Sequence, residues 1–274
     1  YEYPGPNYYS SSTENVWLDE QNRLHLKIVY NDNADIWECA SLVSLKNDWG
    51  YGKYTFEIDD VLMEMINKKG KIFYTNKLDE NVVIGLYTYD GSDTAHKSHN
   101  EIDIEFARWG SKNAKIGNFV VWYDGTDGNL MRNLYTFSLR LVGNSSVHSF
   151  VWNVEGIQFD STGIKEPLDY PSDDFDKLGT ENEGYNYIPE PNNEKVCMNI
   201  WLIKRKDGSS GEPFNISGNK KMKSAEVIIS NFEFIPYENN SPEIHSFIAN
   251  PDSVEIGGNS TITCDASDPD GDEP

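Results

Sequence analysis

Three acidic residues alternate with apolar residues inside the segment Asn100–Gly110. They are Glu101, Asp103 and Glu105, and isoleucines separate them from one another. A period of two predicts a strand with one apolar face and one face that carries three carboxylates. Like charges in a row repel one another, so this acidic face needs a physical or functional reason.

Two kinds of chemistry use such a cluster, and a third interpretation is a strand face that is simply exposed to solvent. Paired carboxylates cleave glycosidic bonds, one as nucleophile and one as general acid. Oxygen-rich clusters also bind Ca²⁺. The Cα atoms of Glu101 and Glu105 lie about 13 Å apart at ~3.3 Å per residue. Side chains that lean inward can close this gap to the ~5–5.5 Å of a retaining glycosidase. Asp103, between them, can hydrogen-bond one carboxylate and keep neighbouring charges from ionising together.

The sequence Glu-Ile-Asp-Ile-Glu at 101–105 resembles the active-site signature of glycoside hydrolase family 16, in the unbulged form found in lichenases. Flanking segments resemble the family in the same order along the chain. These segments are Cys39-Ala40, Gly50–Tyr54, Leu86–Gly91, His148–Trp152 and Met198–Trp201. The resemblance runs from about Asn15 to Tyr237 and so covers most of the chain.

The resemblance implies a role for each acid. Glu101 matches the nucleophile of the family, Glu105 matches its general acid/base, and Asp103 matches the residue that hydrogen-bonds and tunes the nucleophile. This division of labour requires Glu105 to hold a proton near neutral pH while Glu101 stays ionised.

Four further residues are expected to bind substrate. Alternation extends the acidic face to His99 and Trp109, and His99 stands where lichenases place a tryptophan. On the following strand, Asn118 and Trp122 match substrate-contacting positions of the family. An aromatic ring at Trp122 would stack on the apolar face of a sugar, and the alternative for this side chain is ordinary packing.

The sequence also departs from the lichenase pattern. Ser41 and Val43 replace a glutamate and an arginine that grip the sugar, so the grip on the substrate must differ. The N-terminal cysteine of the family is missing, which leaves Cys39 free or paired with Cys197. Where many members bind a structural Ca²⁺ this chain offers Ser230-Asn231, a weaker set of ligands. We therefore expect no required cofactor and no assigned metal site, while structural Ca²⁺ stays open.

Short apolar runs separated by turn residues predict an all-β fold. About a dozen strands with little helix indicate a jelly-roll β-sandwich of two antiparallel sheets over residues 1–238. The expected strands are Val16–Asp19, Leu24–Tyr30, Cys39–Leu45, Tyr51–Ile58, Val82–Tyr89, Asn100–Trp109, Ile116–Tyr123, Tyr135–Val142, Val147–Asn153, Gly156–Phe159, Val196–Ile203 and Ala225–Ile235. Helical spacing of apolar residues predicts one short helix at Val61–Lys71. Residues 166–195 are acidic and rich in Pro, Asn and Gly, and they form a candidate cleft wall.

The composition changes after Tyr237. Residues 243–274 resemble the first strands of a small immunoglobulin-like repeat of the PKD kind, cut short before its core is complete. We expect Ser253–Gly258 and Thr261–Cys264 to form its hairpin and Asp265–Asp272 to form an acidic turn. This turn is either an exposed turn or a Ca²⁺ ligand.

The overall charge limits the class of partner. A formal net charge of -22 argues against nucleic acid and anionic membranes, which are themselves polyanions. No apolar run approaches the ~20 residues of a membrane span. The resemblance implies a monomeric, secreted or cell-surface endo-β-glycosidase that retains anomeric configuration and acts on a β-1,3- or β-1,3-1,4-glucan. The alternative is a non-catalytic carbohydrate-binding or surface protein on the same fold.

Overall fold

The computed structural model describes residues 6–75, 77–125, 128–138, 145–162, 188–203, 212–213, 220–237 and 243–267. In these ranges the chain forms strands, turns and irregular connections. None of the described residues belongs to a helix long and apolar enough to cross a membrane. The chain divides into two compact units, Tyr1–Pro236 and Tyr237–Pro274, which we describe separately.

The first unit is built from strands throughout. Its strands are β1 (Tyr8–Tyr9), β2 (Val16–Leu18), β3 (Leu24–Asn31), β4 (Ile36–Val43), β5 (Gly52–Asn67), β6 (Ile72–Thr75), β7 (Val82–Tyr89), β8 (Ile102–Ala107), β9 (Gly117–Asp124), β10 (Leu130–Phe137), β11 (Ser146–Trp152), β12 (Ile157–Thr162), β13 (Lys195–Leu202) and β14 (Lys220–Pro236). Most of the expected strands are present with shifts of a few residues at their ends. The largest shift concerns β5, which continues nine residues past the expected end at Ile58, while β10 and β14 each begin five residues earlier than expected.

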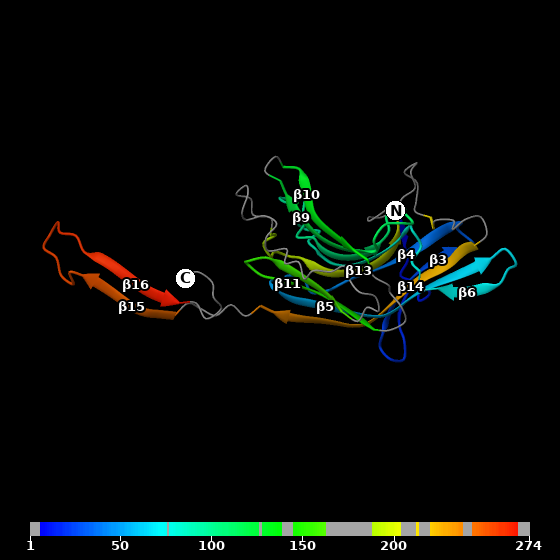
Figure 1. The fold of residues 1–274 in the computed structure, drawn as a ribbon, viewed down its shortest axis with the longest axis horizontal. Coiled ribbons are helices and arrows are strands. Elements are labelled where there is room, and N and C mark those ends of the chain that lie inside the picture. Colours follow the sequence, from blue (N-terminus) through cyan, green and yellow to red (C-terminus); the bar gives the residue numbers. More distant parts are fainter. Residues whose placement is uncertain are drawn as a thin grey trace. The chain divides into compact units, whose positions relative to one another are not determined.

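The strands pair in one continuous sheet that curls over on itself (Figure 1). Its order is β10-β9-β8-β7-β13-β4-β3-β14-β5-β11-β12, with β1, β2 and β6 attached at the sides. The half from β10 to β4 packs against the half from β3 to β12. Phe106 of β8 meets His148 of β11 at 4.8 Å between ring centroids, and Phe119 of β9 stacks on Phe159 of β12 at 4.5 Å. This arrangement confirms the predicted jelly-roll sandwich.

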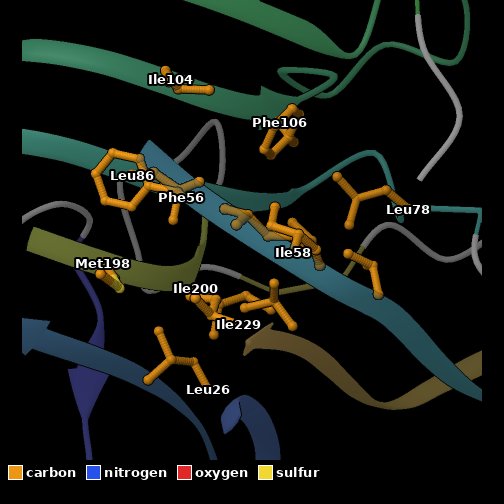
Figure 2. Packing of buried hydrophobic residues seen from close by; sticks show 14 of the residues in the cluster. Leu26, Phe56, Ile58, Leu78, Leu86, Ile104, Phe106, Met198, Ile200 and Ile229 are labelled. Atoms are coloured by element: carbon orange, nitrogen blue, oxygen red, sulfur yellow. The ribbon is translucent and has the colours of Figure 1, made fainter. Parts of the chain in front are cut away.

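The core lies between the two halves of the sheet. Figure 2 shows Ile104 and Phe106 of β8 beside Phe56 and Ile58 of β5, all with 2% or less of their surface exposed. Burial of one such side chain contributes about 1.5–3 kcal/mol to folding. Inward residues on β8 are therefore fixed by packing, and the residues between them must face the opposite side of the sheet.

The predicted helix at Val61–Lys71 is wrong. Residues 61–67 are the second half of β5, which pairs with β6 on one side and with β14 on the other. Val61, Met63 and Met65 are buried while the residues between them are partly exposed, which is the period of a strand. Cross-strand pairing with distant segments thus overrides the local helical spacing.

Residues 163–187 lie outside the described part of the chain, and with them most of the predicted cleft wall at 166–195. The part that is described, 188–194, is irregular, and Lys195 already belongs to β13.

The second unit contains a hairpin of β15 (Glu243–Asn250) and β16 (Thr261–Ser267). The prediction that Ser253–Gly258 forms a strand of this hairpin is wrong, because these residues lie in the loop between β15 and β16. The first three residues of the expected acidic turn belong to β16, and residues 268–274 are outside the described ranges. The likeness of this unit to an immunoglobulin-like repeat stays a prediction.

Candidate active site

A cleft of about 1510 Å³ lies on the face of the β10-to-β4 half that points away from the core. Glu101, Asp103 and Glu105 line this cleft, because the core holds the isoleucines between them. Asp103 and Glu105 lie on β8, and Glu101 directly precedes this strand. The three predicted acids are thus brought together at one site.

Asp103 is the most deeply placed of the three, with 3% of its surface exposed. Nε1 of Trp122, on the neighbouring β9, donates a hydrogen bond of 2.9 Å to Oδ2 of Asp103. Asp103 also shares a side-chain hydrogen bond with Glu101. Burial, followed by the charges of Glu101 and Glu105, raises the pKa of Asp103 well above its usual value. A protonated Asp103 therefore donates its hydrogen bond to Glu101.

The surroundings of Glu101 and Glu105 affect the pKa values of the two glutamates differently. Burial raises the pKa of Glu101 to about 7, and the hydrogen bond from Asp103 opposes this rise. Burial and the charge of Glu101 raise the pKa of Glu105 to about 8, while the guanidinium of Arg132 works in the opposite direction. The hydrogen bond from Asp103 therefore favours the ionised form of Glu101, and the charge of an ionised Glu101 favours the protonated form of Glu105. Pairs of carboxyl groups with separated pKa values are suited to divided acid and nucleophile roles.

Neighbouring strands supply residues that the sequence analysis did not single out. Arg132 of β10 stands opposite Trp122 in the register, with its guanidinium 5.3 Å from the centre of the indole. On the other side of β8, Tyr87 of β7 accepts a 3.1 Å hydrogen bond from Nδ2 of Asn199 on β13. The strand register is the signal that would reveal these residues, because it sets Tyr87 beside Asp103.

Gly85 explains how Asn199 fits into this floor. A Cβ atom at Gly85 would lie 2.6 Å from Oδ1 of Asn199, so the missing side chain makes room for the amide. In the register Gly85 stands between Glu105 and Asn199. The glycine therefore allows the Asn199 amide to approach the cleft floor beside Glu105.

Trp109 and Trp122 both line the cleft. Trp109 is 44% exposed, and its ring lies 6.1 Å from that of Trp201 on β13. Its backbone has a φ of 51°, so it stands beyond the end of β8 and does not continue the alternation.

His99 and Asn118 are not among the residues that line the cleft, and their contact with substrate stays a prediction. His99 has a φ of 52°, and its Nδ1 donates a 2.9 Å hydrogen bond to the carbonyl of Asp90. Asn118 is 1% exposed, and its amide nitrogen donates to backbone carbonyls that include Ile116 at 3.1 Å. Oδ1 of Asn118 is 3.4 Å from Nε1 of Trp109, so this residue supports the cleft wall from behind.

Cys39 and Cys197 are both free thiols. Cys197 pairs in the sheet with Val43, four residues along β4 from Cys39, so the two sulfur atoms do not face each other. No group of three His, Cys, Asp or Glu side chains suited to a metal occurs in the described ranges. At the expected Ca²⁺ position, the hydroxyl of Ser230 donates to the carbonyl of Glu57.

Comparisons with known proteins identify the fold. No protein-family model matches the chain, and no curated protein matches it. Among solved structures, Bacillus licheniformis β-glucanase has a TM-score of 0.54 and 15% identity over 85% of this chain and 86% of its own. The family 16 glycoside hydrolase of the Bacteroides ovatus mixed-linkage glucan PUL, in complex with a G4G4G3G product, has a TM-score of 0.52 and 12% identity over 84% and 89%.

A Mycobacterium tuberculosis immunostimulatory antigen and pseudo β-1,3-glucanase is similar to the same degree, with a TM-score of 0.51 and 18% identity over 84% of this chain and 81% of its own. The chain therefore has the fold of family 16 β-glucanases. The same fold serves glucanases and a pseudo-glucanase, so activity must be argued from the site itself.

Proposed function

We propose that this protein is a retaining endo-β-glycosidase that hydrolyses a β-1,3- or β-1,3-1,4-glucan. The observation that supports this most is the position of the three acids on the cleft floor, where burial raises the pKa of each. A surface strand without function would leave its carboxylates solvated, whereas these are partly or fully desolvated.

In the first step, the carboxylate of Glu101 attacks the anomeric carbon while Glu105 donates its proton to the oxygen of the leaving sugar. The glycosidic C–O bond breaks and a bond between Glu101 and the sugar forms. Asp103 holds the Glu101 carboxylate in place through their hydrogen bond, and Trp122 in turn holds Asp103. Glu101 can therefore attack without first reorienting.

In the second step, the roles at Glu105 reverse. Its carboxylate takes a proton from a water molecule, and the water oxygen attacks the anomeric carbon. The bond between Glu101 and the sugar breaks, and two inversions restore the original configuration. Arg132, whose charge lowers the pKa of Glu105, helps this residue to carry the negative charge that the first step leaves on it.

The second candidate is a carbohydrate-binding protein without activity on the same fold. Ser41 and Val43 favour it, because they line the cleft where the lichenase pattern has a glutamate and an arginine. A weaker grip on the sugar is compatible with binding without turnover. The complete set of acids favours the hydrolase, since binding alone does not need three carboxyl groups on one strand.

Release of reducing ends from a panel of β-1,3-glucan, β-1,3-1,4-glucan and galactan distinguishes these functions. The hydrolase releases reducing ends from at least one polymer with retention of the anomeric configuration, and Glu101→Gln abolishes the release. Tight binding without release from any polymer would favour the second candidate. Such polymers are extracellular, so we also propose that the protein is secreted or displayed on the cell surface, acts as a monomer and needs no cofactor.

A further inference from the structure

One row across the cleft floor has a cation at each end. Arg132 on β10 pairs with Trp122 on β9, and the backbone N–H of Trp122 donates to the carbonyl of Glu101. On the other side of Glu101, Tyr89 of β7 pairs with Lys195 of β13. Thr88 pairs with Ile102 in the antiparallel register, so the next residue on β7, Tyr89, lies beside Glu101. The row thus runs Arg132, Trp122, Glu101, Tyr89, Lys195.

Neither cation forms an ion pair with another described residue. All the ion pairs among the described residues lie elsewhere, and in those ranges no side-chain nitrogen of Arg132 or Lys195 donates a hydrogen bond. The chain has 45 acidic and 23 basic residues, so acidic side chains that could pair with these two cations are abundant. Two unpaired cations in the same cleft therefore suggest that their partner is a ligand.

The acids of the cleft are engaged with groups other than these two cations. Asp103 accepts a hydrogen bond from Trp122 and shares one with Glu101, and burial raises the pKa of Glu105, which favours its protonated form. The fourth acid that lines the cleft, Asp90, already accepts hydrogen bonds from Ser92 and from the backbone of Asn193. The guanidinium and the ammonium group remain as donors for an anion.

Arg132 is the better placed of the two for recognition. Its guanidinium lies 5.3 Å from the centre of the Trp122 ring, a contact that restricts the side chain before any ligand binds. A guanidinium presents donors in a planar fork that matches a carboxylate or a sulfate. Restriction in advance lowers the entropy that binding would otherwise cost.

We propose that the cleft selects a polysaccharide that carries anionic substituents, with Arg132 as the main contact and Lys195 as a second one on the opposite side. Carboxylate and sulfate groups share the required chemistry. This inference deepens the proposed function by naming a class of substrate, and it concerns binding, so it can be tested apart from hydrolysis.

The test compares polymers that have the same backbone and differ only in charge. The probes are unsubstituted β-1,3-glucan, its carboxymethyl derivative and its sulfate ester. Dissociation constants are measured by calorimetry with the Glu105→Gln protein, whose amide imitates the protonated acid and slows cleavage of the polymer during the measurement. We expect at least one charged polymer to bind about tenfold more tightly than the neutral one, the scale of one charge-assisted contact. A preference for one charged form identifies the substituent.

The net charge of -22 makes this expectation demanding, because the field of the whole protein repels a polyanion. A preference for the charged polymers can therefore arise only from local contacts. Adding Arg132→Gln should remove most of the preference, while Arg132→Lys should keep part of it. Lys53→Gln makes the same change of charge on β5, outside the cleft, and should leave the preference intact.

Equal or tighter binding of the neutral polymer overturns the inference, and so does binding of none of the three. A preference that survives both Arg132→Gln and Lys195→Gln also overturns it. Equal hydrolysis of neutral and charged polymers by the native protein would contradict this inference and leave the proposed function standing. Selective binding of a charged polymer without any hydrolysis would support this inference and contradict the proposed function.

Discussion

The indole nitrogen of Trp122 donates a 2.9 Å hydrogen bond to Oδ2 of Asp103, which also shares a side-chain hydrogen bond with Glu101. An aromatic residue on β9 therefore orients the carboxyl group that orients the expected nucleophile. The same indole carries the guanidinium of Arg132 near its ring. Trp122 is thus both part of the cleft surface and a support for its chemistry.

Replacement of Trp122 should separate these two contributions. Trp122→Phe keeps a ring but loses the N–H donor, so we expect kcat to fall about tenfold, the scale of one hydrogen bond, with KM little changed. Trp122→Ala should in addition weaken polysaccharide binding by ~1–3 kcal/mol. Steady-state kinetics and melting curves of both variants measure these effects. A large fall in melting temperature with unchanged binding would show that the ring serves only to pack the protein.

Substitution of the acids tests the proposed chemistry directly. Glu105→Gln should lower kcat by about 10²–10⁴-fold, the usual contribution of a general acid. Glu101→Gln should abolish turnover, since no carboxylate remains to attack the sugar. Circular dichroism should show the native fold in both proteins.

Rescue by azide distinguishes the two roles. With a small side chain at 105, added azide should give a product of retained anomeric configuration, and with a small side chain at 101 an inverted one. Near-normal turnover of either Gln variant without azide would end the assignment.

The rate of hydrolysis should depend on pH as a bell. Below about pH 7 Glu101 becomes protonated and loses its nucleophilic form, and above about pH 8 Glu105 loses the proton that it must donate. We therefore expect the maximum of kcat/KM between these values. Arg132→Gln removes a charge that lowers the pKa of Glu105, so it should move the basic limb to higher pH. A basic limb that stays in place would contradict this role of Arg132.

The same pKa values predict how stability changes with pH. The folded protein holds the protons of Glu101 and Glu105 more tightly than the unfolded chain, so stability falls as pH rises from the unfolded value of ~4.3 through the folded values. Glu105→Gln removes the part of this loss that Glu105 contributes. At pH 9 the variant should melt about 2–4 °C above the native protein, equivalent to about 1 kcal/mol in a domain of this size. At pH 5 the two should be similar.

The first compact unit should be sufficient for activity. All the cleft residues precede Tyr237, and the second unit contributes a single described hairpin, which is marginal in water by itself. A chain of residues 1–238 should keep the turnover and the urea midpoint of residues 1–274. A loss of more than ~2 kcal/mol, large for a peripheral segment, would show that the second unit stabilises the first.

The strand of acids could be predicted from sequence because its alternation is local. The period of two survives folding from Ile102 to Ala107, and it assigns the acids and the isoleucines to opposite faces. The prediction that the alternation continues fails just beyond both ends of β8. Positive φ angles at His99, Asn100 and Trp109 turn the backbone, and alternation cannot anticipate them.

Other features of the site depend on segments that are distant in sequence. Arg132, Tyr87 and Asn199 reach the cleft through the pairing of β10, β7 and β13, which no local pattern reveals. Asn118 has the residue type of a sugar contact, but its amide is used by backbone carbonyls. The second half of β5 reads locally as a helix and becomes a strand because β6 and β14 hold it on both sides.

The alternation of β8 has a consequence for chains that fold wrongly. If β8 slipped by one residue against β7 and β9, Asp103 and Glu105 would enter the core and Ile104 would enter the cleft. Buried carboxyl groups without partners would cost several kcal/mol, comparable to the whole stability of a domain. The residues proposed to cleave the substrate therefore also act as a check on assembly, because the only register that can persist is the one in which the cleft is complete.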